Sequence, residues 1–320
     1  MRVLVTGASG FVGRALVDEI LARGQQEVLG TVRRAPKNAK CRLFETGDLA
    51  ASPDWSNALE GTDVVIHLAG RAHVLSDAGA DRLNEFRKIN VDATVSLAKA
   101  AVKAGVRRFV FVSSIGVNGA KTSGAAFSED CEPLPVADYA FSKLEAEQQL
   151  RTVLNETDVE LVIVRPPLVY AGHAPGNFRR LLKLVSTGLP LPFGKVRNAR
   201  TMVALDNLVD LLICCIDHPR AANEVFLCAD NESISLPEMV RLLADGMGRK
   251  TRLIPFPVFF LKLAAALLRK RSVIDQLCSS LVVNNLKTKQ FLGWAPVVDA
   301  KSALRAAGRD YMIMEKERLQ

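Results

Sequence analysis

The sequence predicts an α/β protein with a doubly wound parallel sheet and a smaller, mostly helical C-terminal lobe. Three observations lead to this fold class. A glycine-rich turn follows the first apolar run, near the N-terminus. Short apolar runs then alternate with helical stretches to about residue 165, as in parallel strands joined by crossover helices. Beyond that point the alternation fades and helical patterns dominate.

The first strand and the turn after it predict a dinucleotide site. Val3–Val5 is an apolar, β-branched run, and residues 6–13 read TGASGFVG. Gly7 permits a tight turn, Gly10 lets backbone N–H groups approach a pyrophosphate, and Gly13 lets the next helix pack closely on the strand. The N-terminus of that helix, residues 11–23, adds partial positive charge. The alternative is a glycine-rich loop that serves only as a turn, but three glycines in register between strand and helix favour a Rossmann sheet.

This pattern divides the chain into two parts. We assign residues 1–165 to a dinucleotide-binding domain, to which residues 200–229 return. Residues 166–199 and 230–320 are assigned to a substrate-binding lobe.

The second strand, residues 27–32, bears on the choice of coenzyme. Folds that prefer NAD place a carboxylate at the end of this strand, about 20 residues after the glycines, where it binds the ribose 2′-OH. Here Arg33 and Arg34 follow Val32, and no carboxylate is present. A guanidinium group pairs with a 2′-phosphate, so we expect NADP, with NAD as the other possibility. The alternative is that both arginines are solvated loop charges.

The next two strands lead toward the same edge of the sheet. Residues 41–44 form the third strand and precede Asp48, which either accepts from the adenine amino group or caps the next helix. Residues 63–68 form the fourth, and the small residues Ala69 and Gly70 leave room there for a ligand. For His67 we favour a hydrogen-bonded core residue.

A long helical stretch and a further strand follow. Residues 80–104 contain Asn90, a polar amide amid apolar spacing that predicts a buried hydrogen bond. Residues 107–113 form a strand that delivers Ser113 and Ser114 to the ligand edge. Residues 116–136 are rich in Gly, Ser and Pro and are expected to form a loop over the site.

Tyr139 and Lys143 lie four residues apart in a helix that runs to about Leu154, so they share one helix face. Such a pair is common by chance. Its position after a strand that ends in two serines, and after a nucleotide fingerprint, makes it a candidate catalytic pair.

The remaining elements are less regular. In chain order we predict a buried strand over 161–165, a helix over 177–187, a stretch over 189–198 interrupted by Pro and Gly, and a strand over 200–205. A helix to 216, a last strand over 225–228 and a helix over 235–247 follow. In the helix over 235–247, Ser235 and Glu238 resemble a capping box.

The composition excludes several classes. The net charge of +8 favours anionic ligands, but no cluster of Lys and Arg interleaves with aromatics, so nucleic acid is not expected. The six cysteines form no CxxC pair, which argues against a zinc site and suits a reduced, cytoplasmic protein. We expect no signal peptide, because a glycine fingerprint occupies the N-terminus. The apolar stretch 256–268 is too short to span a bilayer, and we expect a packed helix of the C-terminal lobe rather than a membrane-surface helix.

Several motifs together resemble the extended short-chain dehydrogenase/reductases over nearly the whole chain. They are TGASGFVG, GDL at 47–49, HLAG at 67–70, Asn90, Ser114, YAFSK at 139–143 and RPPLVY at 165–170. HLAGRAH, Gly176–Phe178 and RNARTMVALDNLVD further resemble the branch that acts on UDP-sugars. That branch contains UDP-hexose 4-epimerases and the bacterial O-antigen reductases that make UDP-N-acetyl-quinovosamine or UDP-N-acetyl-fucosamine.

The resemblance implies a role for each matching residue. Tyr139 would be the general acid/base, Lys143 would hold the nicotinamide ribose and lower the pKa of the tyrosine, and Ser114 would bond the reacting oxygen. The coenzyme would be held by Gly7, Ser9, Gly10, Phe11, Val12, Arg33, Asp48, Leu49, Leu68, Ala69, Gly70, Tyr139, Lys143 and Pro166. The substrate would be bound by Arg71, Ser114, Tyr139, Asn177 and Arg200. No metal ligand is implied, and a homodimer built from the helices near 80–104 and 137–154 is expected.

The resemblance therefore predicts an NAD(P)H-dependent reductase of a UDP-linked 4-keto-6-deoxy-N-acetylhexosamine. A UDP-hexose 4-epimerase is the alternative, and an acidic strand end would favour it. A nucleotide-sensing protein without catalysis is a third hypothesis, but the presence of both Tyr139 and Lys143 argues against it. We find no clear match for the second phosphate-binding arginine of the epimerases, because Arg269 and Arg271 lie nearby but do not align.

Overall fold

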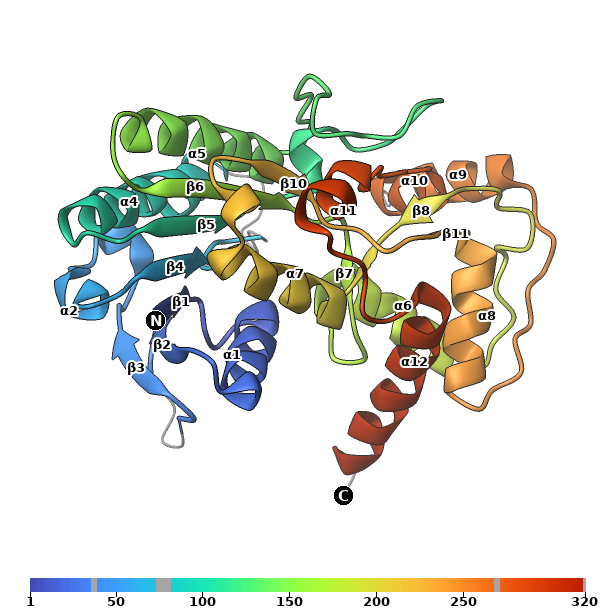
Figure 1. Ribbon diagram of the computed structural model, residues 1–320. Helices are drawn as coiled ribbons and strands as arrows, with labels where there is room; N and C mark the ends of the chain where they lie inside the picture. Colours follow the sequence, from blue (N-terminus) through green and yellow to red (C-terminus); the bar gives the residue numbers. More distant parts are fainter. Residues whose placement is uncertain (36–38, 73–81, 268–270, 319–320) are drawn as a thin grey trace.

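A seven-stranded parallel sheet forms the centre of the computed structural model, which describes residues 1–35, 39–72, 82–267 and 271–318 (Figure 1). All six strand pairs run parallel. In sheet order the strands are β10 (Val225–Leu227), β6 (Glu160–Arg165), β5 (Arg108–Val112), β4 (Val64–His67), β1 (Arg2–Thr6), β2 (Glu27–Val32) and β3 (Arg42–Glu45). The predicted sheet is confirmed, and each predicted strand of this sheet lies within about one residue of its expected bounds. The order reverses direction between β1 and β4, which is where such sheets bind ligands.

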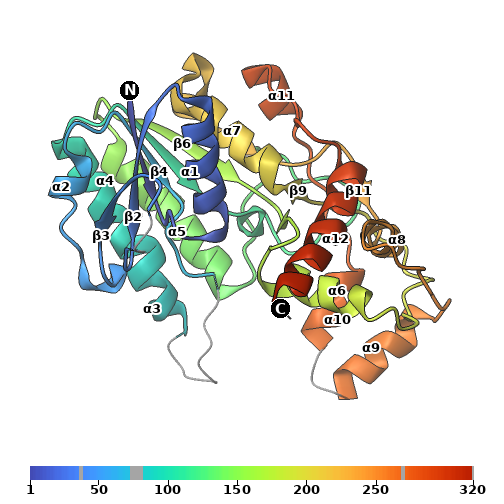
Figure 2. The same cartoon turned by 90° about the horizontal axis from the view of Figure 1, so that it is seen from below.

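Helices cover both faces of the sheet, as continuous apolar strands require (Figure 2). One face packs on α1 and α7, and the other on α2, α4 and α5. The bounds of the elements on these faces are α1 (Phe11–Arg23), α2 (Ser56–Leu59), α3 (Arg82–Arg87), a π-helical segment (Lys88–Asp92), α4 (Ala93–Lys103), α5 (Asp138–Leu154), α7 (Leu205–Asp217) and α11 (Leu286–Leu292).

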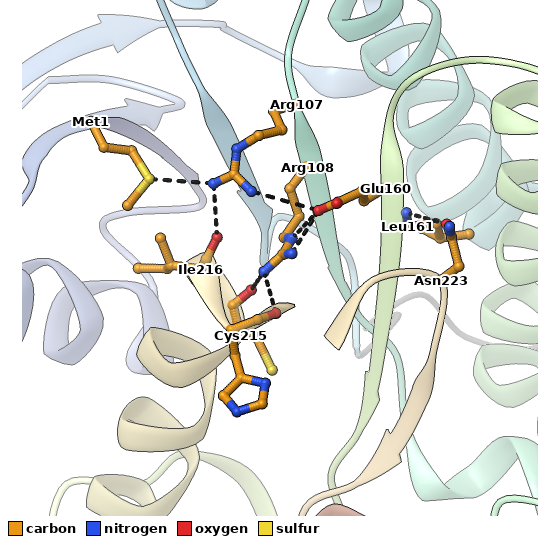
Figure 3. A network of polar contacts seen from close by, with 9 residues as sticks. Met1, Arg107, Arg108, Glu160, Leu161, Cys215, Ile216 and Asn223 are labelled. Carbon is orange, nitrogen blue, oxygen red and sulfur yellow. Dashed lines mark hydrogen bonds and ion pairs between the residues drawn. The ribbon is translucent and has the colours of Figure 1, made fainter. Parts of the chain in front are cut away.

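Two buried arginines tie the helices to the sheet. Arg165, at the end of β6, forms a two-point ion pair with Glu147 of α5, with Nε–Oε1 at 2.9 Å, and both side chains are almost fully buried. Arg108 of β5 donates to the carbonyl oxygen of Cys215 in α7 at 2.9 Å and pairs with Glu160 of β6 (Figure 3). Removing one partner of the buried Arg165–Glu147 pair costs about 3–5 kcal/mol.

The C-terminal part has its own core of α6 (Gly176–Ser186), α8 (Leu236–Gly246) and α12 (Ala300–Glu317). At the crossing of α8 and α12, a Cβ on Gly246 would lie 1.9 Å from the Arg305 carbonyl oxygen. A Cβ on Gly308 would lie 2.3 Å from the Leu243 carbonyl oxygen. The two helices therefore pack backbone to backbone. Ser235 caps α8 through the Glu238 N–H at 3.3 Å, which confirms the serine half of the predicted capping box.

The predicted strand over 200–205 is wrong in extent. It is divided into β8 (Arg200–Thr201) and β9 (Val203–Ala204), and α7 already begins at Leu205. These short strands pair with β11 (Ser233–Ile234) and β7 (Val169–Tyr170) in separate two-stranded sheets. β11 also shows that β10 is not the last strand.

The loop over 116–136 begins with a 3₁₀ turn, Ile115–Val117, and then joins the C-terminal part. Thr122 N donates to the Ser280 carbonyl, Phe127 N to the Val282 carbonyl, and Asn284 N to the Phe127 carbonyl, at 2.8–2.9 Å. Its attachment to residues 280–284 was not predicted.

The apolar stretch 256–268 forms the helix α9 (Val258–Leu267), followed by α10 (Arg271–Cys278). Val258 and Leu261 pack partly buried against the C-terminal core, as expected of a packed helix. Phe259 and Leu267, however, are 70% and 79% exposed, so the expectation of a fully packed helix is wrong for one face. Among the described residues, no helix is long and apolar enough to cross a membrane.

Candidate functional site

A cleft of about 730 Å³ lies over the carboxyl ends of β1, β2 and β4, where the strand order reverses. Its described lining includes ten of the predicted ligand-binding residues: Gly7, Ser9, Gly10, Arg33, Asp48, Leu49, Leu68, Ala69, Gly70 and Arg71. The structure therefore brings residues from four separate segments to one surface.

The glycines of the opening turn have no room for side chains. A Cβ on Gly13 would lie 2.2 Å from the Gly7 carbonyl oxygen, and Gly7 itself has a φ of +69° and touches the Ala69 backbone. Gly10 has an extended backbone as the N-cap of α1 and uses no side-chain cap. Gly10 lines the cleft directly before α1 and puts no side chain beside the start of the helix, and this cradle fits a dinucleotide pyrophosphate.

His67, at the end of β4, forms hydrogen bonds that connect this strand to the end of β1 next to the cleft. Its Nδ1 lies 2.7 Å from Thr6 Oγ1 and its Nε2 lies 2.9 Å from Thr94 Oγ1. Thr94 donates to the Asn90 carbonyl, so it accepts from His67 Nε2–H, and Thr6 donates to the unprotonated Nδ1. Thr6 Oγ1 in turn accepts from the N–H groups of Leu68 and Ala69 at 3.2 Å. The predicted core role of His67 is confirmed, and burial lowers its pKa to about 3.

Asn90 lies in the π-helical segment and fixes the loop that follows β4. Its Oδ1 accepts from Arg71 N at 2.8 Å, and its Nδ2 donates to the Arg71 carbonyl at 3.1 Å and to Ser142 Oγ at 2.9 Å. Ser142 then donates to the Tyr139 carbonyl. The buried hydrogen bond predicted for Asn90 is confirmed, and it links the cleft wall to the first turn of α5.

Lys143 reaches the cleft wall from α5. A Cβ on Gly70 would lie 3.5 Å from its Nζ and 3.1 Å from Asn90 Oδ1. The ammonium donates to the Val112 carbonyl at 2.9 Å and lies 4.5 Å from the centre of the Phe111 ring. Burial lowers the pKa of Lys143 to about 8, and the Glu147 carboxylate opposes this shift. The amine therefore stays mostly protonated at neutral pH.

Tyr139 is partly buried in the first turn of α5, with its ring edge-on to Phe86 at 6.1 Å. Burial raises the pKa of its phenol to about 12. The lowering of this pKa by Lys143, which the family resemblance implies, stays a prediction.

Ser114 follows β5 and caps the 3₁₀ turn, accepting from Gly116 N at 3.1 Å. A Cβ on Gly116 would lie 3.3 Å from Ser114 Oγ and 3.2 Å from the Ala140 methyl group, so only a glycine separates the serine from α5. Ser114 is partly exposed, whereas Ser113 is buried.

Asp48 and Arg33 lie at the far end of the cleft. Asp48 Oδ1 accepts from Ala50 N at 3.1 Å, so this residue caps the short helix after it, and its predicted contact with the adenine stays a prediction. Both side chains are exposed, and both line the cleft. No carboxylate stands at the end of β2, as the sequence shows.

Asn177 and Arg200 meet at a third residue, Gln276 of α10, outside the described lining of the cleft. Asn177 Nδ2 lies 3.1 Å from Gln276 Oε1, and Arg200 Nη1 donates to the carbonyls of Gln276 and Ser279. Burial lowers the pKa of Arg200. The structure thus gathers two predicted substrate residues on the C-terminal part.

Phe11, Val12 and Pro166 do not line the described cleft. Phe11 packs between the two hydrophobic cores, with its ring 5.1 Å from His173. Their predicted coenzyme contacts stay predictions. Five residues that line the cleft were not predicted: Thr31, Val32, Thr46, Gly47 and Ile89. The first two continue the predicted strand β2, and the next two directly precede Asp48, so their positions in the sequence could have indicated them.

Comparisons with known proteins find similar sequences and folds. Residues 3–229 match the family described as the NAD dependent epimerase/dehydratase family. A protein of Vibrio cholerae named UDP-glucose 4-epimerase is 44% identical over 296 residues, which cover 92% of this chain and 90% of that protein. N-acetyl-α-D-glucosaminyl-diphospho-ditrans,octacis-undecaprenol 4-epimerase of Escherichia coli O157:H7 is 27% identical, covering 80% of this chain and 76% of that protein. UDP-glucose 4-epimerase of Thermotoga maritima has the same fold, with a TM-score of 0.78 at 20% identity and full coverage of both chains.

Proposed function

The chain belongs to the NAD dependent epimerase/dehydratase family, and from this premise we propose that it transfers hydride to or from C4 of a UDP-linked sugar. The observation that carries the proposal is the juxtaposition of Gly70, Asn90 and Lys143. It places a buried ammonium of α5 directly behind the wall of the glycine-lined cleft.

In this proposal the cleft holds the dinucleotide. Gly7, Ser9 and Gly10 bind the pyrophosphate, Asp48 and Leu49 the adenine, and Leu68, Ala69 and Gly70 the nicotinamide ribose. Asn177 and Arg200 bind the UDP moiety from the C-terminal part, and Arg71 lines the sugar pocket. The net charge of +8 favours the approach of the diphosphate.

The bound nicotinamide supplies the hydride chemistry, and this chain supplies the proton and the orientation. Tyr139 donates its phenolic proton to the C4 oxygen when a ketone is reduced, and its raised pKa keeps that proton available at neutral pH. Ser114 donates a hydrogen bond to the same oxygen and so stabilises its developing negative charge. Lys143 holds the ribose and, as an ammonium, favours the phenolate in the oxidation direction.

Two overall reactions are consistent with this half-reaction. The 44% identity to a protein named UDP-glucose 4-epimerase supports epimerisation at C4 of a UDP-hexose. The second candidate is reduction of a UDP-linked 4-keto-6-deoxy-N-acetylhexosamine to UDP-N-acetyl-quinovosamine or UDP-N-acetyl-fucosamine for O-antigen. It is supported by Arg33, which lines the cleft at a strand end without a carboxylate and suits NADPH.

One experiment separates these candidates. Purified protein is incubated with UDP-glucose or UDP-N-acetylglucosamine without added coenzyme, and separately with UDP-4-keto-6-deoxy-N-acetylglucosamine and NADPH. NMR of the products reports the configuration at C4, and NADPH absorbance reports reduction. Epimerisation without NADPH oxidation removes the reductase. NADPH consumption without epimerisation removes the epimerase, and failure of both contradicts the proposal.

The proposal extends to assembly and location. We expect a homodimer through the helices near 80–104 and 137–154 in the cytoplasm, where UDP-sugars are made, and sedimentation of the purified protein checks the dimer.

A further inference from the structure

The helix α9 carries an exposed apolar stripe on the side that faces away from the C-terminal core. Phe259, Phe260, Leu263 and Leu267 are 70%, 52%, 50% and 79% exposed. At 3.6 residues per turn these four side chains fall within an arc of roughly 100°. The packed residues Val258 and Leu261 lie on the opposite side of the helix. We call this set of four residues the α9 stripe.

The α9 stripe continues into the segment that leads to the helix. The rings of Phe256 and Phe260 lie 6.1 Å apart, and those of Phe259 and Phe260 lie 5.5 Å apart. Ile254 and Phe256 are 48% and 38% exposed. Both views place α9 at the outer edge of the C-terminal part (Figures 1 and 2). A contiguous apolar surface of this kind marks a site that binds another surface.

The charged residues in the sequence segment that contains α9, residues 249–272, are all basic. The sequence from Arg249 to Ser272 contains seven Lys and Arg residues and no Asp or Glu. Of these basic residues, Arg249, Lys250 and Arg252 are exposed in the structure. A second copy of the chain docked by two-fold symmetry would place this basic segment against itself, which is unfavourable. An anionic surface complements it.

We propose that the α9 stripe inserts into the interface of a bilayer that contains anionic lipids, which makes this protein a peripheral membrane protein. The helix is too short to span a bilayer, and its exposed Phe and Leu side chains with flanking basic residues are typical of helices that lie in the headgroup region. Each basic residue near an anionic surface contributes about 1 kcal/mol.

The placement also bears on the site. The next helix, α10, holds Gln276, which bonds both Asn177 and Arg200. If the proposed function is right, the membrane contact lies beside the end of the site that receives the sugar nucleotide. Membrane binding itself does not depend on that function, so the two proposals fail separately.

Vesicle flotation tests the proposal on the full chain. The wild type is expected to float with phosphatidylcholine vesicles that contain half phosphatidylglycerol, and to bind at least 10-fold less well to vesicles of phosphatidylcholine alone. The double variant F259E/L263E is expected to lose at least 10-fold in vesicle affinity. The matched control L286E/I313E adds the same charge at two other exposed apolar residues, 53% and 49% exposed, and is expected to bind like the wild type. Circular dichroism and turnover without lipid check that each variant is folded.

A spectroscopic variant gives an independent readout. Trp55 and Trp294 are 2% and 6% exposed, so their emission is expected to stay constant, and F259W adds one exposed reporter. Its emission is expected to shift to the blue on phosphatidylglycerol vesicles. No flotation of the wild type, equal binding of F259E/L263E, or an unshifted F259W would overturn the proposal. So would a wild-type oligomer that F259E/L263E dissociates without any vesicle binding, because the α9 stripe would then be a protein interface.

Discussion

Asn90 holds Arg71 by both of its backbone polar groups, accepting from the Arg71 N–H at 2.8 Å and donating to the Arg71 carbonyl at 3.1 Å. One side-chain amide therefore forms the two hydrogen bonds that a neighbouring strand would otherwise give to the backbone of this loop after β4. The same amide donates to Ser142 of α5, so this one side chain fixes the loop relative to α5.

Asn90→Leu is expected to destabilise the protein by about 2–4 kcal/mol, because two backbone groups and one hydroxyl lose buried partners. The variant is also expected to bind the coenzyme at least 10-fold more weakly, since Gly70 and Arg71 line the cleft. Urea denaturation and coenzyme titration measure the two effects. Unchanged coenzyme affinity would contradict the assignment of this loop to the coenzyme.

Tyr139→Phe is expected to lower kcat by about 10²–10⁴-fold, because it removes the proposed proton donor and leaves the ring contact with Phe86. Coenzyme affinity is expected to stay within about 3-fold, since only the hydroxyl is lost. Turnover with the substrate of the active assay measures the first effect and fluorescence titration the second. A variant with wild-type kcat would remove Tyr139 from the mechanism.

Arg33→Ala is expected to weaken NADPH binding by about 10–100-fold and to leave NADH binding unchanged, because a hydrogen bond to a charged group contributes about 1.5–3 kcal/mol. Arg34→Ala is the matched control, since Arg34 is also exposed but is absent from the described lining of the cleft. Titrations of both coenzymes against both variants measure the difference. Equal effects of the two variants would identify Arg33 as a solvated loop charge.

His67 predicts a loss of stability in acid. Its pKa is about 3 in the folded protein and about 6.5 in the unfolded chain, so between these values the unfolded chain binds one more proton. The free energy of unfolding is therefore expected to fall as pH falls from 6.5 toward 3, by on the order of 4–5 kcal/mol in total. His67→Gln is expected to lack this part of the pH dependence, whatever its stability at pH 7. Equal slopes for both proteins in urea denaturation across this range would show that His67 is not the group responsible.

Gly13→Ala is expected to destabilise the protein by about 1–3 kcal/mol or more, because the new methyl group would meet the Gly7 carbonyl oxygen at 2.2 Å. It is also expected to abolish measurable coenzyme binding. Gly24→Ala, at the other end of α1, is the control: its φ is +64°, so it carries backbone strain of about 1 kcal/mol but no clash. Coenzyme binding by Gly13→Ala as tight as that of Gly24→Ala would contradict the cradle.

The parts of the fold with strong local signals could be predicted from the sequence. The first three strands and α1 are confirmed because β-branched runs and glycines act over a few residues. The helix α5 was also predicted to its observed end at Leu154. The division of the stretch over 200–205 was not predictable, because its two short strands exist only through partners at β7 and β11.

The candidate site shows the same limit. The places of Gly7 and Gly10 in the cleft were predicted, because only glycine suits a tight turn and a close approach of the backbone to a ligand. The hydrogen bonds of Thr6 and Thr94 to His67 join three different elements, and no local pattern encodes such a meeting. The burial that raises the pKa of Tyr139 was not predicted, because it depends on packing that the spacing of Tyr139 and Lys143 does not contain. The exposed face of α9 was missed because a helix that is apolar except for Lys262 is predicted to lie in the core.

The buried pair of Arg165 and Glu147 restricts how this protein can diversify. It fastens α5, and with it Tyr139 and Lys143, to the central sheet, so the proposed proton-transfer groups are held in place relative to β6. If the proposed function is right, a change of sugar preference is expected to arise in the opposite part, around Asn177, Arg200 and Gln276. Directed evolution toward new sugars would therefore vary the residues around Asn177, Arg200 and Gln276 and keep α5 unchanged.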